Sequence, residues 1–255
     1  YNNFMKSVFY IFTLILILSS TISAQPFESR KSSSSSKQPV LLELFTSQGC
    51  IRCPPANRNL AFFEKEQPFA DVEIITLALH VDYWDNPQWK DEFSSRLFTR
   101  RQEIYSMQFK LDGTFTPQMV VDGETHFVGS NLEEAKKAIA KAAKKEKPQV
   151  ELNLIEDKLK IKIPNLPKHA VSTLFLAITE SNLKSKGSGG NSVKLLEHGS
   201  IVRELRSLGW VQPQDESIEM ETFLQLQPDW KRENLKFVVF VQENYSRKIL
   251  TVSRM

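Results

Sequence analysis

Cys50 and Cys53 are the only cysteines of the chain, and two residues separate them. They follow an apolar run at residues 40–45, which predicts a buried strand, and precede a helix-like stretch that extends to about residue 67. A disulfide between cysteines this close would constrain the unfolded chain far less than a disulfide that closes a long loop. The pair therefore favours a thiol–disulfide redox site over a structural crosslink.

Disulfide exchange requires a thiolate, and the start of a helix favours one. The unpaired N–H groups and positive dipole end of a helix can lower the pKa of a cysteine thiol to roughly 3.5–7.5. We therefore expect Cys50 to be the nucleophile and Cys53 to resolve the mixed disulfide. Arg52 either adds a charge that favours the thiolate or points into solvent. Glu43, on the predicted strand, either relays protons to Cys53 or faces solvent or a lysine.

Pro117 is the second anchor of the predicted site. Asp122 and Gly123 lie between two apolar runs and predict a hairpin turn, so that Pro117 opens the first strand of the hairpin. We expect the Thr116–Pro117 bond to be cis and to lie against the cysteines, where backbone groups would pair with an extended peptide. An ordinary trans proline at an edge strand is the alternative.

His80 lies at the end of a second buried strand, predicted at residues 72–81, and Tyr83 and Trp84 follow that strand. Ligands meet an α/β sheet at such strand ends. His80 is interpreted as a proton carrier or metal ligand, with a hydrogen-bonded structural role as the alternative. Tyr83 and Trp84 would line a peptide-binding rim or pack against the next helix.

The elements around these residues alternate between strand and helix. After the second strand we expect a helix at residues 88–108, the hairpin, and a helix that opens with a capping box at Ser130 and Glu133. This order, with the cysteines at the first crossover, is the thioredoxin arrangement. After Pro148 the pattern changes to about six strands. The predicted fold class is an α/β thioredoxin-like domain over residues 39–147, followed by a small all-β, sandwich-like domain over residues 148–255.

The N-terminal region predicts export. An apolar stretch at residues 8–18 follows Lys6 and ends in small residues at Ala24, which is the layout of a signal peptide over residues 1–24. Residues 25–38 are rich in serine and predict a flexible linker. We expect a periplasmic or secreted protein, in which a disulfide persists, with membrane contact only through the signal segment if it is uncleaved.

Charge and composition restrict the classes of partner that we expect. The chain has 33 Lys and Arg against 30 Asp and Glu, a net charge of +3, which gives no reason to expect a nucleic-acid partner. The lysines of residues 136–147 are explained by a solvated helix face. Protein thiols and disulfides are the expected partners, and no cofactor is expected.

Several segments resemble a known family. Residues 43–50, 53–56, 80–85, 116–123, 199–205 and 238–242 are similar to a bacterial family of secreted, thioredoxin-like proteins catalogued as domain of unknown function 1223. The resemblance implies a thioredoxin-like fold with a C-terminal β extension, a redox pair at Cys50 and Cys53, and its proline at Pro117. The chain departs from the family pattern at residues 51–52, 57 and 86–88, which bears on the redox potential and on the approach groove.

Two other functions remain open. Thiolates favour Cu(I), so Cys50, Cys53 and His80 would make a copper-handling site, whereas two thiolates are few for tetrahedral zinc. Alternatively, the chain is a non-catalytic module that binds a partner through its C-terminal strands. Thiol–disulfide exchange, and thus an oxidoreductase, remains the leading hypothesis.

Overall fold

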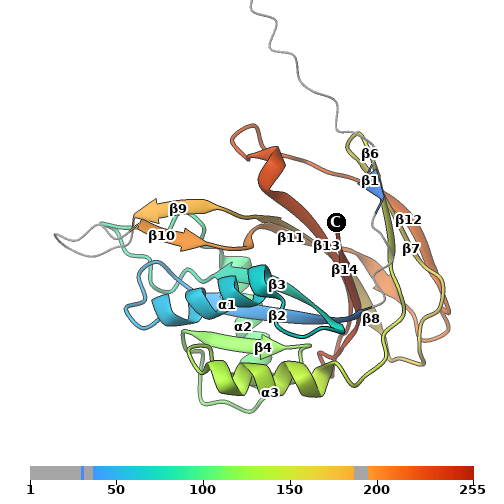
Figure 1. Cartoon of the computed structure of the whole chain (residues 1–255), viewed down its shortest axis with the longest axis horizontal. Coiled ribbons are helices and arrows are strands. Elements are labelled where there is room, and N and C mark those ends of the chain that lie inside the picture. Colours follow the sequence, from blue (N-terminus) through green and yellow to red (C-terminus); the bar gives the residue numbers. More distant parts are fainter. Residues whose placement is uncertain (1–29, 32–36, 187–194) are drawn as a thin grey trace, which may run out of the picture.

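The computed structural model describes residues 30–31, 37–186 and 195–255 (Figure 1). The predicted signal peptide, residues 1–24, and most of the predicted linker, residues 25–38, lie outside these residues. None of the helices in the described part of the chain combines the length and the apolar character that a membrane span requires.

One mixed eight-stranded sheet runs through the molecule (Figure 1), with the strand order β14-β13-β8-β11-β3-β2-β4-β5. The central pair β2 and β3 is parallel, and β11 joins β3 in parallel through Ile201 and Ala78. The strands are β2 (Gln38–Thr46), β3 (Val72–His80), β4 (Gln118–Val121), β5 (Thr125–Val128), β8 (Ser172–Glu180), β11 (Ile201–Val211), β13 (Leu235–Glu243) and β14 (Ile249–Arg254).

The predicted fold class, an α/β thioredoxin-like domain followed by a separate all-β domain, is wrong. Strands β8, β11, β13 and β14 lie after residue 148, yet they extend the same sheet that holds β2 and β3. The physical reason is that β3 offers an unpaired edge, which β11 occupies. The described residues contain only three α-helices, and the large sheet dominates the structure.

A smaller sheet packs against the C-terminal strands. It contains β1 (Arg30–Lys31), β6 (Glu151–Ile155), β7 (Lys158–Ile163) and β12 (Ile218–Phe223), in the order β1-β6-β7-β12. Apolar side chains of β6 and β7 share a core with those of β8 and β13. A separate hairpin joins β9 (Leu183–Lys186) to β10 (Leu195–His198), and the 3-10 helix η1 (Arg232–Asn234) precedes β13.

The helices cover both faces of β2. Leu42 and Leu44 of β2 share a core with α1 (Pro54–Glu66) and α3 (Leu132–Ala142). Leu41 and Phe45 point the other way, into a core shared with α2 (Arg96–Gln108). Helix α2 begins later than the predicted residue 88, because Ser95 caps it by accepting a hydrogen bond from the amide of Leu97.

The predicted hairpin turn at Asp122 and Gly123 is confirmed. Both residues have positive φ, 48° and 71°, as a tight hairpin turn requires. Asp122 is buried, and its carboxylate accepts hydrogen bonds from the amide of Leu41 at 2.9 Å and from Lys147 Nζ at 2.6 Å. The turn therefore locks β4 against β2.

Gly123→Ala is expected to destabilise the protein by at least about 2 kcal/mol. A Cβ at this position would lie 1.8 Å from the carbonyl oxygen of Arg247, and φ is left-handed. Gly113→Ala is the control, because a Cβ there meets nothing within 4 Å. Chemical denaturation measures both variants, and equal midpoints for the two would contradict the expectation.

Candidate functional site

Cys50 and Cys53 form a disulfide at the start of α1, with their Cα atoms 5.4 Å apart. Cys50 lies in the turn after β2, where its amide donates to the carbonyl of Ser47, and Cys53 is the N-cap of α1. Cys50 is 4% exposed and Cys53 is 0% exposed, whereas Ile51 between them is 91% exposed. The motif thus presents its middle residues to solvent and leaves only an edge of Cys50 accessible.

The first turn of α1 has few backbone donors for a thiolate. Pro54 and Pro55 occupy its first two positions and carry no amide hydrogen. The amide of Asn57 is bonded to the carbonyl of Cys53, so Ala56 has the free amide of this turn. This helix start therefore offers a thiolate fewer N–H groups than one without prolines.

The Thr116–Pro117 bond is cis, as predicted. Phe45 of β2 pairs with Gln118, so Pro117 lies one residue further along, next to the end of β2 that leads to Cys50. Gly129 donates its amide to the carbonyl of Pro117, and a Cβ on Gly129 would lie 3.5 Å from Pro117 and 3.1 Å from Ala56. Pro117 is therefore packed beside the first turn of α1.

The loop between β3 and α2 covers the turn that carries Cys50. A Cβ on Gly49 would lie 3.2 Å from Trp84 Cβ and 2.9 Å from the ring of Trp89. Trp84 Nε1 also donates to Thr116 Oγ1 at 2.8 Å. Trp84, Thr116 and the cysteine turn are thus brought together, and 39% of Trp84 remains exposed beside them.

Tyr83 lies next to Trp84, with its ring centroid 6.5 Å from that of Trp84, and its hydroxyl donates to Gln102 of α2 at 3.1 Å. Burial raises the pKa of the Tyr83 hydroxyl, so it stays protonated at neutral pH. Tyr83 therefore contacts α2, which is one of the two predicted roles, and 40% of it stays exposed; its role in a peptide-binding rim stays a prediction.

His80 is bonded to Asp91, a residue that the sequence analysis missed. Both side chains are buried, and His80 Nδ1 lies 2.8 Å from Asp91 Oδ2. Burial acts to raise the pKa of Asp91, but its hydrogen bond with His80, the charge of His80 and the amide of Gln48 lower it below the ordinary value. Asp91 is therefore ionised at neutral pH, and Nδ1 of His80 donates the hydrogen bond.

Of the predicted residues, Glu43 lies apart from this cluster. Glu43 points to the α2 face of the sheet, where Arg101 Nε donates to it at 2.6 Å and the Tyr105 hydroxyl at 2.5 Å. The structure does not bring Glu43 to Cys53, because α1 packs on the opposite face of β2. Arg52 is exposed at the surface between the two cysteines.

Within the described residues, no group of three or more His, Cys, Asp or Glu side chains is placed to hold a metal ion. The suggested set of Cys50, Cys53 and His80 is not such a group. His80 is hydrogen-bonded through Nδ1 to Asp91.

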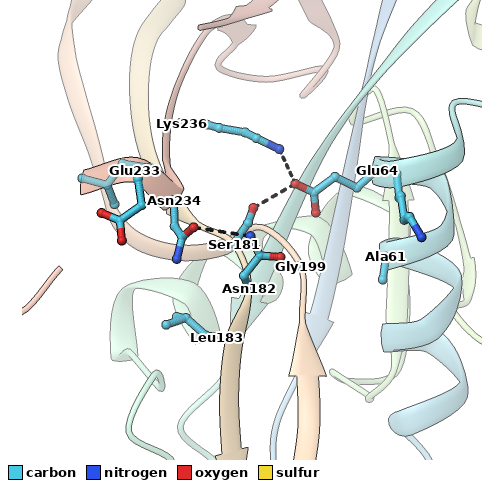
Figure 2. A pocket seen from close by; sticks show the side chains of 11 residues that line it. Ala61, Glu64, Ser181, Asn182, Leu183, Gly199, Glu233, Asn234 and Lys236 are labelled. Atoms are coloured by element: carbon cyan, nitrogen blue, oxygen red, sulfur yellow. Dashed lines mark hydrogen bonds and ion pairs between the residues drawn. The ribbon is translucent and has the colours of Figure 1, made fainter. Parts of the chain in front are cut away.

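A cavity of about 430 Å³ lies at the other end of α1 (Figure 2). Figure 2 shows the Glu64 carboxylate between Lys236 Nζ at 2.5 Å and Ser181 Oγ at 3.0 Å. Burial acts to raise the pKa of Glu64, but the charge and hydrogen bond of Lys236 lower it overall. This ion pair joins α1 to β13, and the cavity contains none of the predicted site residues.

A family model described as "Protein of unknown function (DUF1223)" matches residues 41–242. A crystal structure of a protein from Agrobacterium tumefaciens is similar with a TM-score of 0.70 and 22% identity, over 88% of this chain and 96% of that chain. HBP35 of Porphyromonas gingivalis is similar with a TM-score of 0.55 and 14% identity, over 88% and 76%. At these identities the two structures show the fold alone. No curated protein matches the chain.

Proposed function

The chain belongs to this family of proteins of unknown function, and we propose that it catalyses thiol–disulfide exchange through Cys50 and Cys53 outside the cytoplasm. One observation carries the proposal: the two cysteines are bonded to each other at the start of α1, with Cys50 the more accessible of the two. The packing of Pro117 beside the same helical turn supports it.

The proposed reaction has two balanced steps. The Cys50 thiolate of the reduced protein attacks a partner disulfide, so that a mixed disulfide forms and one partner thiolate leaves. The Cys53 thiolate then attacks the Cys50 sulfur, which releases the second partner thiolate and closes the Cys50–Cys53 bond. The partner gains the two electrons that the protein loses, and the reverse sequence oxidises a partner dithiol.

The limited exposure of Cys50 restricts which partner segments can reach its sulfur. Cys50 is almost covered, and its exposed neighbours are Ile51 and Arg52 in the motif and Trp84 beside Gly49. We expect a partner sulfur to approach past these side chains or after the covering loop moves. Ile51 and Trp84 suit an extended polypeptide segment that carries a cysteine next to apolar residues.

The proposed location outside the cytoplasm rests on the signal-like residues 1–24. In that environment the disulfide persists and meets other protein disulfides.

Trapping with Cys53→Ser tests the proposal. Without Cys53 the mixed disulfide at Cys50 is not resolved, so partners are expected to remain covalently attached and to be released by dithiothreitol. The variant would be expressed in the envelope of the source cell, and the adducts identified by mass spectrometry. The double variant Cys50→Ser/Cys53→Ser is the control.

An empty trap would argue against exchange. Recovery of the same partners by the double variant would instead indicate non-covalent docking, which is the behaviour of a binding module.

A further inference from the structure

The turn that carries Cys50 is held from outside the cysteine motif. The Asp91 carboxylate oxygen Oδ2 accepts hydrogen bonds from the amide of Gln48 at 2.8 Å and from Ser47 Oγ at 3.2 Å. Ser47 Oγ in turn accepts the amide of Gly49 at 3.1 Å, and the carbonyl of Ser47 accepts the amide of Cys50 at 3.2 Å. Asp91 therefore holds Ser47 and Gln48 directly, and Gly49 through Ser47.

Asp91 is itself held rigidly. Its other carboxylate oxygen accepts the amide of Phe93 at 3.0 Å, its own amide donates to Asp85 Oδ1 at 3.1 Å, and His80 at the end of β3 completes the set. The carboxylate is fully buried, and charge-assisted hydrogen bonds are strongest in such surroundings. Asp91 thus ties the Cys50 turn to the end of the neighbouring parallel strand.

We propose that Asp91 is a positioning residue that favours the disulfide form of the Cys50–Cys53 pair. Two physical effects act in the same direction. Fixing the turn keeps Cys50 in place next to Cys53, which raises the effective concentration of one thiol at the other. The negative charge of Asp91, partly offset by the charge of His80 at 2.8 Å, disfavours a thiolate at the turn in the reduced protein. The exposed Arg52 carries a positive charge, which favours a thiolate and so opposes the charge effect of Asp91. It does not alter the positioning effect.

This inference rests on the proposed function, because Asp91 would set the reduction potential of the same Cys50–Cys53 pair. The test reaction is the equilibrium with glutathione. The protein dithiol and one glutathione disulfide give the protein disulfide and two reduced glutathione molecules, so two electrons pass from protein to glutathione.

Asp91→Asn is expected to lower the equilibrium constant for forming the protein disulfide about tenfold, which equals a rise in reduction potential of about 30 mV. The measurement is the oxidised fraction of the full protein in glutathione buffers, followed by mass spectrometry after acid quenching and alkylation. A substitution that destabilises the oxidised and reduced forms equally would lower the free energy of unfolding but leave this equilibrium constant unchanged. The constant therefore distinguishes a positioning role from a general effect on stability.

Two further variants keep the test decisive. Ser47→Ala removes one of the hydrogen bonds to Asp91 and is expected to shift the constant in the same direction by a smaller factor, even if Asp91→Asn fails to fold. Asp122→Asn is the matched control, because Asp122 is also a buried, hydrogen-bonded carboxylate and asparagine tolerates its positive φ. The control is expected to lose stability and keep the wild-type constant.

The proposal is overturned if Ser47→Ala and any folded Asp91→Asn keep the wild-type constant, or if Asp122→Asn shifts it equally. The outcome is separable from that of the proposed function, because glutathione is the only partner in this assay. A shifted constant together with an empty Cys53→Ser trap would reject protein exchange and retain the role of Asp91.

Discussion

Cys50→Ser is expected to abolish thiol–disulfide exchange, with a loss of at least roughly a thousandfold in rate, as the removal of a nucleophile usually causes. Cys53 is fully buried beneath Cys50, so it does not replace Cys50 as the attacking group. The measurement is the formation of a mixed disulfide between the reduced protein and a peptide that carries a glutathione disulfide, followed by mass spectrometry.

Cys53→Ser is the matched control for this prediction. It keeps the first step and is expected to accumulate the peptide adduct, whereas Cys50→Ser forms none. Adduct formation by Cys50→Ser at the rate expected of Cys53→Ser would mean that Cys53 is the nucleophile, and the assignment of the two roles would then be reversed.

Glu43→Gln is expected to lower the free energy of unfolding by about 3–5 kcal/mol, because it leaves a buried cation without its partner. Arg101 donates two hydrogen bonds to Glu43, at 2.6 and 3.1 Å, and its guanidinium also stacks over the rings of Tyr105, Phe175 and Phe240. Burial acts to lower the pKa of Arg101, but the Glu43 carboxylate raises it overall, so Arg101 stays charged. Urea denaturation of the oxidised protein measures the loss.

The double variant Glu43→Gln/Arg101→Met tests the cause. Removing the cation as well is expected to recover a large part of the lost stability, since apolar side chains of similar size often replace a buried ion pair at little cost. A double variant less stable than Glu43→Gln by the full cost of Arg101→Met alone would show that the two residues act independently.

The features that sequence predicted correctly are those set by a few neighbouring residues. Asp122 and Gly123 form their turn because both accept positive φ, and the strand at residues 72–81 follows from a nearly continuous apolar run. The pairing of Cys50 with Cys53 at the start of a helix is equally local. In each case the neighbours along the chain decide the structure.

The sequence does not predict toward which face of the sheet the Glu43 side chain points. In a half-buried strand, alternation of apolar and polar residues shows which side faces the core. Strand β2 is buried on both faces, with Leu42 and Leu44 on one side and Leu41 and Phe45 on the other, so no alternation exists. The sequence pattern of this strand therefore does not show whether Glu43 faces Cys53, as a proton relay requires.

Asp91 and the continuous sheet depend on contacts between distant residues. Asp91 lies in a stretch that reads as helix, and nothing nearby in sequence indicates that it bonds to Ser47 and Gln48. Similarly, the apolar strands after residue 148 fit a separate sandwich as well as they fit an extension of the first sheet. The free edge of β3 decides between them, and strand patterns do not encode which edge is left open.

The placement of β11 beside β3 has a consequence for how the molecule can be divided. A fragment that ends near residue 148 would keep both cysteines but would expose the edge of β3 that β11 pairs with at Ala78, together with the side of α1 that Lys236 contacts through Glu64. The N-terminal part that carries the cysteines is therefore not expected to fold as an independent domain. The segment that carries the cysteines and the later strands of its sheet are instead expected to fold together.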